Sequence, residues 1–137
     1  MDEKQNILVI DDDPNIVRLI KFYVGKKYQI EYAYNGMQAI DILREKKFDL
    51  ILVDMFMPQM DGMSFLKELR KKLKLDTMVI MVTAQEPTDQ TMKMIVQHAY
   101  DIIQKPFTAK RLQLTILNAF KYKLLSDENK QLRKDQI

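Results

Sequence analysis

Four short apolar runs constrain the fold of this chain more than any other feature. They comprise residues 7–10, 50–53, 78–82 and 102–103. Each run is built from aliphatic residues and Met and shows no apolar–polar alternation, which predicts strands that are buried on both faces. Strands of this kind occur in parallel sheets, because the crossover helices then cover both sides of the sheet.

Helical patterns separate these runs and carry clear start signals. The signals are Asp13-Pro14, where Asp13 is the cap and Pro14 the first helical residue, and the pairs Asn35-Gly36, Asp61-Gly62, Glu86-Pro87 and Phe107-Thr108, which lead into the other helices. A half-exposed edge strand is expected at residues 28–33, where apolar and polar residues alternate. The pattern therefore predicts an α/β fold, (βα)₅, with a doubly wound parallel five-stranded sheet, right-handed crossovers and helices on both faces.

The length and the tail set the expected domain organisation. With 137 residues the chain suits one domain, which we place at residues 1–122. Residues 123–137 are predicted to be a C-terminal helical extension or a linker, since no Pro or Gly stops the last helix there.

The amino-acid composition indicates where the protein is expected to work and which classes of partner it is not expected to bind. There is no Cys and no apolar stretch long enough to span a membrane, so we expect a cytoplasmic protein without membrane contact. Residues 108–137 hold seven Lys or Arg and three Asp or Glu. Because acids are interspersed and aromatic residues end at Tyr122, we interpret this segment as a solvated helix face and expect no direct nucleic-acid binding.

A reactive type of side chain follows each of the four apolar runs. Asp11 and Asp12 follow the first run, Asp54 the second, Thr83 the third and Lys105 the fourth. In a parallel sheet these residues meet at the carboxyl edge, where open α/β sheets bind their ligands. Two carboxylates about 5 Å apart repel by roughly 3 kcal/mol, which Lys105 or a hard cation such as Mg²⁺ would offset. An aspartate in such a pocket is suited to attack phosphorus.

These motifs resemble those of receiver domains of two-component response regulators. The resemblance covers about residues 5–122 and rests on the segments around Asp11 and Thr83, on Lys105-Pro106-Phe107, and most specifically on residues 54–62. It implies the flavodoxin-like strand order 2-1-3-4-5, for which a chemotaxis receiver is a known example.

The resemblance also implies roles for single residues. Asp54 would accept a phosphoryl group. Mg²⁺ or Mn²⁺ would be bound by Asp12, Asp54 and the main-chain carbonyl of Phe56, with Asp11 acting mainly through water. Thr83 and Ala84 would contact the phosphoryl group, and Lys105 would pair with it. The Lys105–Pro106 bond would be cis.

Partners follow from the same resemblance. A sensor histidine kinase or a phosphotransfer protein would donate the phosphoryl group, and a surface around the fourth helix and fifth strand would respond. The chain would be no conventional enzyme, because it would catalyse only its own phosphorylation and dephosphorylation. A phosphorylation-dependent homodimer and an output domain beyond Ile137 stay open, as does a stand-alone receiver.

Two positions are expected to change how such a receiver would switch and how fast it would lose its phosphoryl group. Receivers often carry Tyr or Phe three residues before the lysine, where this chain has Ile102, and its aromatic Tyr100 lies two residues earlier. The readout of Thr83 is therefore expected to differ from an aromatic switch. Phe56 is bulky and lies two residues after Asp54, so we hypothesise that it limits the access of water and slows hydrolysis.

Three competing functions fit these residues less well. An aspartate-nucleophile phosphatase of the haloacid dehalogenase kind needs a second acid two residues after the nucleophile, where Phe56 stands. A receiver-like adaptor that works without phosphorylation would not need the complete acid set. A flavin or nucleotide binder would need a phosphate loop rich in Gly or hydroxyl residues, and the chain has only three glycines.

Overall fold

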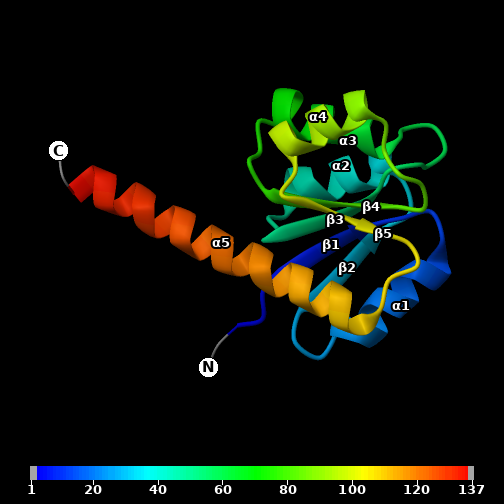
Figure 1. Cartoon of the computed structure of the whole chain (residues 1–137), viewed down its shortest axis with the longest axis horizontal. Coiled ribbons are helices and arrows are strands. Elements are labelled where there is room, and N and C mark those ends of the chain that lie inside the picture. Colours follow the sequence, from blue (N-terminus) through cyan, green and yellow to red (C-terminus); the bar gives the residue numbers. More distant parts are fainter. Residues whose placement is uncertain (1–2, 136–137) are drawn as a thin grey trace.

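The computed structural model describes residues 3–135 and contains one parallel sheet of five strands (Figure 1). The strand order is β2-β1-β3-β4-β5, which confirms the predicted flavodoxin-like topology. The strands are β1 (Asn6–Ile10), β2 (Gln29–Ala33), β3 (Leu50–Asp54), β4 (Met78–Thr83) and β5 (Asp101–Gln104).

Helices cover both faces of the sheet, as the sequence pattern predicted. Figure 1 shows α2, α3 and α4 on one face and α1 and α5 on the other. The helices are α1 (Pro14–Val24), α2 (Gly36–Glu45), α3 (Gly62–Lys67), α4 (Asp89–His98) and α5 (Ala109–Asp135), and α3 continues into a π-helical segment, η1 (Glu68–Lys72).

Side-chain caps start the helices where the sequence signals them. The Asp13 carboxylate accepts a hydrogen bond from the Asn15 amide at 2.9 Å, ahead of Pro14 at the first helical position. The first free amides of α2, α3 and α4 are bound in the same way. Their caps are Asn35, Asp61 and Thr88.

Two hydrophobic layers hold the sheet between its helices. One layer packs β-strand side chains such as Leu8 and Ile51 against α2, α3 and α4. The other packs Ile7 and Leu52 against α1 and α5. Neighbouring residues of one strand thus serve opposite layers, which is why the central strands contain no exposed polar position.

The register places the strand ends at one edge. Ile10 of β1 lies beside Val53 of β3, and Asp54 of β3 lies beside Val82 of β4. The residues that follow β1, β3 and β4 therefore leave the sheet close together.

Two helical details differ from the sequence pattern. On α4 the apolar residue Val96 is 73% exposed, and its neighbour Ile95 is the buried residue of the helix. The helix starting at Gly62 changes to π geometry at Glu68, which places Arg70 partly inside the protein. Arg70 therefore does not share the exposed position of its charged neighbours Lys71 and Lys72.

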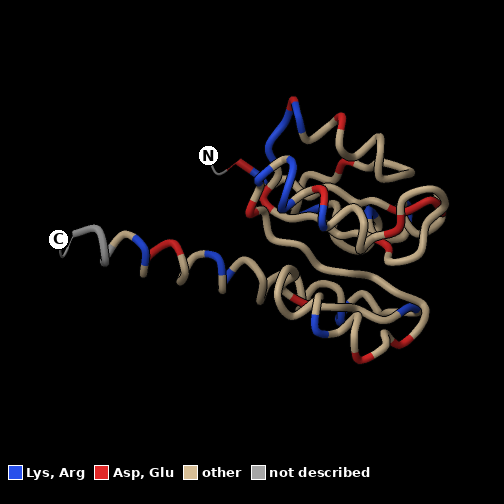
Figure 2. The backbone as a smooth tube through the Cα atoms, turned by 90° about the horizontal axis from the view of Figure 1, so that it is seen from above, with Lys and Arg blue, Asp and Glu red and all other residues tan. Residues whose placement is uncertain are grey.

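The last helix is continuous from Ala109 to Asp135 and passes the predicted domain boundary at residue 122 without a break. Its 27 residues correspond to a length of about 40 Å. Figures 1 and 2 show its C-terminal part projecting away from the sheet, and Figure 2 shows both acidic and basic residues along it. The division at residue 122 stays a prediction, and residues 136–137 of the predicted extension lie outside the described part.

Among the helices of the described residues, none combines the length and the apolar character that crossing a membrane requires.

Candidate functional site

The end of β3 presents Asp54 at the carboxyl edge of the sheet. Asp54 is only 6% exposed, and its carboxylate accepts a long hydrogen bond of 3.4 Å from the Phe56 amide. Gly62 begins α3 directly behind this strand end, because a Cβ at Gly62 would lie 2.5 Å from the Asp54 carbonyl oxygen. The Asp61-Gly62 pair thus allows α3 to start against the residue that carries the central carboxylate.

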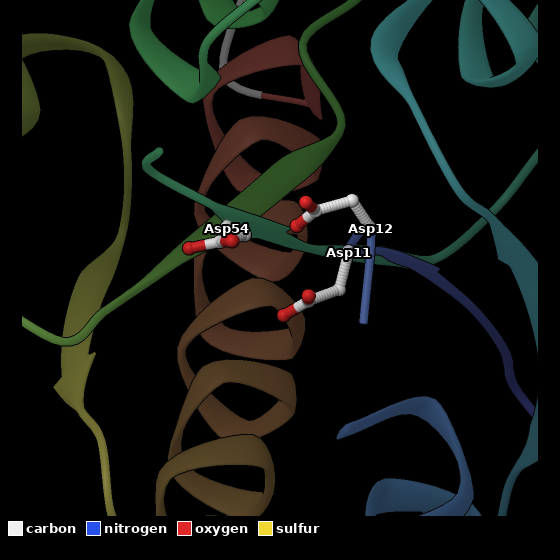
Figure 3. Close-up of side chains that lie close together, drawn as sticks. All are labelled: Asp11, Asp12 and Asp54. Carbon is white, nitrogen blue, oxygen red and sulfur yellow. The ribbon is translucent and has the colours of Figure 1, made fainter. Parts of the chain in front are cut away.

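The end of β1 supplies two more carboxylates. Figure 3 shows Asp11 and Asp12, which follow β1, close to Asp54 at the end of β3. Asp11 is 2% exposed and accepts a hydrogen bond of 2.9 Å from the Asp13 amide, whereas Asp12 is exposed. The edge therefore combines two buried acids with one that faces solvent.

Lys105 reaches this cluster from the loop after β5. Its Nζ lies 2.9 Å from an Asp11 oxygen and 3.7 Å from an Asp54 oxygen. The Lys105 amide also donates to the Thr83 carbonyl at 2.7 Å, which continues the pairing of β4 with β5 and sets the starting point of the side chain. The Lys105–Pro106 peptide bond is cis.

The electrostatics of the cluster act most strongly on Asp54. Burial, and then the charge of Asp11, raise the pKa of Asp54 to about 6, while Lys105 and the Phe56 amide act in the opposite direction. A single ammonium group thus offsets only part of the repulsion among three acids.

The three acids fit a hard divalent cation. Asp11, Asp12 and Asp54 each offer one carboxylate oxygen, and these oxygens lie within 4.8 Å of one another. An all-oxygen set at a partly open edge suits Mg²⁺, which keeps several waters. The carbonyl of Phe56 follows in the same loop, and its predicted role as a ligand stays a prediction.

Thr83 ends β4 beside this cluster and is 1% exposed. Its hydroxyl donates to the Gln85 carbonyl at 2.8 Å and accepts from the Gln85 amide at 3.1 Å. The hydroxyl is therefore bound to the loop that leads to α4. Ala84 is exposed at the start of that loop.

The position that departs from the usual receiver pattern lies on β5. Ile102 is half-buried beside Met81 of β4 and packs against the layer of α2, α3 and α4. Tyr100 instead contacts Tyr122 of α5, with ring centroids 5.4 Å apart. The aromatic side chain nearest this position thus contacts the last helix.

Sequence reasoning missed the role of Arg70. Its guanidinium donates two hydrogen bonds to the His98 carbonyl, at 2.6 and 3.2 Å, and one to the Leu75 carbonyl at 2.8 Å. Arg70 therefore joins η1 to the last turn of α4, the helix that follows Thr83. The charged residues around Arg70 give no sequence signal for this contact, because the π-helical turn determines which of their side chains points inward.

Comparison with known proteins agrees with this geometry. The response regulator receiver domain family matches residues 7–117. The transcriptional regulatory protein ZraR of Klebsiella oxytoca is 36% identical over 126 residues, covering 91% of this chain and 28% of ZraR. The response regulator GtcR of Aneurinibacillus migulanus is 32% identical over 123 residues, covering 86% of this chain and 50% of GtcR. The chain thus spans half or less of each of these relatives.

A solved structure shares the whole fold. The response regulator receiver domain protein of Clostridium thermocellum superposes with a TM-score of 0.79 at 31% identity, covering 88% of this chain and 98% of that one. The acid cluster and its lysine lie at the carboxyl edge of the same fold. The chain therefore belongs to the response regulator receiver domain family.

Proposed function

We propose that Asp54 accepts a phosphoryl group from the phosphohistidine of a sensor histidine kinase or of a phosphotransfer protein. The observation that carries this proposal is the cluster itself, in which Asp11, Asp12 and Asp54 meet within 4.8 Å and Lys105 pairs with two of them. A nucleophilic oxygen, a cation and oxygen ligands for a metal are the parts that phosphoryl transfer needs.

The transfer would be a displacement at phosphorus. An Asp54 carboxylate oxygen forms the new O–P bond, the P–N bond to the imidazole breaks, and its electron pair returns to the nitrogen. Lys105 stabilises the negative charge on the phosphoryl oxygens, and the buried position of Asp54 limits competing water. Mg²⁺ or Mn²⁺ held by Asp11, Asp12 and Asp54, with the Phe56 carbonyl, would supply further neutralisation of that charge.

Phosphorylation changes the charge at Asp54 from about −1 to near −2, which strengthens its pairing with Lys105. The Thr83 hydroxyl is bound to Gln85 in this structure and would serve as a hydrogen-bond donor to the new oxygens. If Thr83 leaves Gln85 for the phosphoryl group, the loop before α4 is released. The response would then reach a partner surface around α4 and β5, with Ile102 in place of an aromatic switch.

The receiver would act on an output. ZraR is named as a transcriptional regulatory protein, and it is far longer than the segment matched here. An output domain beyond Ile137, or a homodimer formed on phosphorylation, fits the same proposal. The chain itself would catalyse only the gain and loss of its own phosphoryl group.

The decisive test uses a small phosphodonor. The chain is incubated with phosphoramidate and Mg²⁺, and its intact mass is measured with and without a chelator. We expect an adduct of about 80 Da that requires Mg²⁺ and that is absent in Asp54→Ala. Asp41→Ala, at an exposed carboxylate of α2, is the control and should keep the adduct. An adduct that persists in Asp54→Ala, or none in any variant, would refute the proposal.

A further inference from the structure

The loop of residues 55–61 follows Asp54 and carries Phe56, whose carbonyl the proposed function uses as a metal ligand. The two ends of this loop are tied together, because the Gly62 amide donates to the Met55 carbonyl at 2.9 Å. A shift of the chain between these ends would move the Phe56 carbonyl relative to the carboxylates. The shape of the loop therefore bears on metal binding.

The tip of the loop has an unfavourable backbone conformation. Gln59 has a φ of 70°, which lies in the left-handed region that residues with a Cβ rarely adopt. The Met60 amide donates to the Pro58 carbonyl across this residue at 2.8 Å, so the chain reverses within three residues. Such a conformation persists only where surrounding contacts hold it. A contact that holds the turn is therefore expected next to Gln59.

Met60 makes such a contact with the first residue of α2. A Cβ added at Gly36 would lie 2.6 Å from the Met60 Sδ, 3.1 Å from its Cγ and 3.2 Å from its Cβ. Much of the Met60 side chain, and not only its tip, therefore lies against the backbone of Gly36. Asn35 caps α2 by accepting a hydrogen bond from the Gln38 amide at 2.8 Å, which fixes the place of Gly36.

Gly36 is needed at this position for space and not for its backbone conformation. It is buried at the start of α2, and none of the glycines in the described part of the chain has a positive φ. An alanine would suit a helical backbone at least as well as glycine does. The cost of adding a methyl group at Gly36 should therefore come from its overlap with Met60.

We propose that Met60 is a positioning residue of the acid-cluster site. Its contact with Gly36 holds the strained turn at Gln59, and thereby keeps the Phe56 carbonyl where metal binding requires it. This inference rests on the proposed function, which assigns the Phe56 carbonyl to the metal. It deepens that function by adding two residues, Gly36 and Met60, that lie outside the acid cluster and carry no charge.

The test measures the Mg²⁺ dissociation constant of the full chain by isothermal titration calorimetry, with the rate of the phosphoramidate adduct as a second readout. Gly36→Ala displaces the Met60 side chain and Met60→Ala removes it, and we expect each to weaken Mg²⁺ binding by about tenfold. In the Met60→Ala background the added methyl group no longer meets Sδ or Cγ. Gly36→Ala should therefore change the affinity by less than about twofold there.

Met63→Ala is the matched control. Like Met60, Met63 is half-buried and packs against the layer of α2, α3 and α4, so the same truncation removes a similar amount of apolar contact. Met63 belongs to α3 and not to the loop. Its replacement should lower the melting temperature about as much as Met60→Ala does, and should change the Mg²⁺ affinity by less than about twofold.

Two results would overturn the proposal. One is an equal effect of Gly36→Ala with and without the Met60 side chain, because the effect would then not act through Met60. The other is a lower melting temperature of Met60→Ala with an unchanged Mg²⁺ affinity, because the contact would then serve stability alone. If melting curves show that Gly36→Ala does not fold, the comparison of Met60→Ala with Met63→Ala decides the question by itself.

Failure of the proposed function gives a different result. A wild-type chain that binds Mg²⁺ without forming the phosphoryl adduct would refute phosphorylation at Asp54, and the Mg²⁺ affinities of the variants would still test Met60. A wild-type chain that forms the adduct, with variants that bind Mg²⁺ equally well, would refute the role of Met60 alone. A wild-type chain that binds no Mg²⁺ would overturn both proposals.

Discussion

Lys105 Nζ lies 2.9 Å from the carboxylate of Asp11, across 94 residues of sequence. Asp11 is almost fully buried, so this ammonium group compensates a charge that solvent cannot reach. The pair also sets the environment of Asp54, whose carboxylate lies 3.7 Å from the same Nζ. The charge balance around Asp11 and the environment of Asp54 therefore depend on one lysine.

Replacing Lys105 should expose this dependence. Lys105→Met leaves Asp11 buried without its cation, and we expect a loss of about 3 kcal/mol in the free energy of unfolding, measured in urea at neutral pH without metal. Lys46→Met breaks an ion pair with Glu31 that is partly exposed and should cost less than about 1 kcal/mol. If the loss comes from the unpaired acid, Asp11→Asn should restore much of it in the Lys105→Met background, and no recovery would contradict this account.

The raised pKa of Asp54 predicts how stability varies with pH. The pKa is about 6 in the folded chain against 3.8 for a free aspartate, so the folded state holds its proton more tightly. Stability contributed at this position is therefore present below about pH 4 and is lost as the pH rises to about 6. In chelator, Asp54→Asn should be more stable than wild type by about 2 kcal/mol at about pH 8. The gain should shrink towards about pH 4 in denaturant titrations, and a gain that does not vary with pH would contradict this cause.

Metal binding should stabilise the fold through the acid cluster. At a hundredfold excess over its Kd, Mg²⁺ should raise the free energy of unfolding by about 3 kcal/mol, measured by thermal melts. Asp12→Ala should abolish the increase without unfolding the chain, because Asp12 is exposed. Asp41→Ala should retain it. The Mg²⁺ effect should weaken below about pH 6 as Asp54 takes up a proton, and an increase retained in Asp12→Ala would argue against this site.

Arg70 should hold the C-terminal end of α4. Arg70→Met leaves the His98 and Leu75 carbonyls without their donor, and we expect a loss of about 2 kcal/mol in the free energy of unfolding. Amide hydrogen exchange in the last turn of α4 should become faster than in wild type. The neighbouring exposed residue provides the control, Lys71→Met, with little effect on either quantity. Unchanged exchange at His98 and Ala99 in Arg70→Met would show that the contact is dispensable.

Phe56 should slow the loss of the phosphoryl group. Its side chain is 54% exposed in the loop directly after Asp54, where it can shield the site from water. Phe56→Ala should therefore shorten the lifetime of the phosphorylated chain by about three- to tenfold, followed by intact mass after removal of the phosphodonor. Val96→Ala removes an exposed apolar side chain of α4 and serves as the control. Hydrolysis as fast in wild type as in Phe56→Ala would contradict the shielding role.

Local signals determined the order of elements in this chain. Unbroken apolar runs indicate strands buried on both faces, and the Asp13-Pro14 and Asp61-Gly62 pairs start helices where they were predicted. The meeting of Asp11, Asp12, Asp54 and Lys105 follows from that order, because parallel strands bring their carboxyl ends to one edge. Hydrophobic periodicity and helix capping depend on residues only a few positions apart. The sequence alone is therefore enough to predict them.

Tertiary packing decided the features that depend on how helix faces meet. The π-helical turn directs Arg70 to the His98 carbonyl, α4 buries Ile95 and leaves Val96 exposed, and Tyr100 contacts Tyr122. Phe22 of α1 and Leu114 of α5 likewise line a common groove only because the two helices pack side by side. None of these contacts has a local signature, because each depends on the rotation of one element against another that is distant in the sequence.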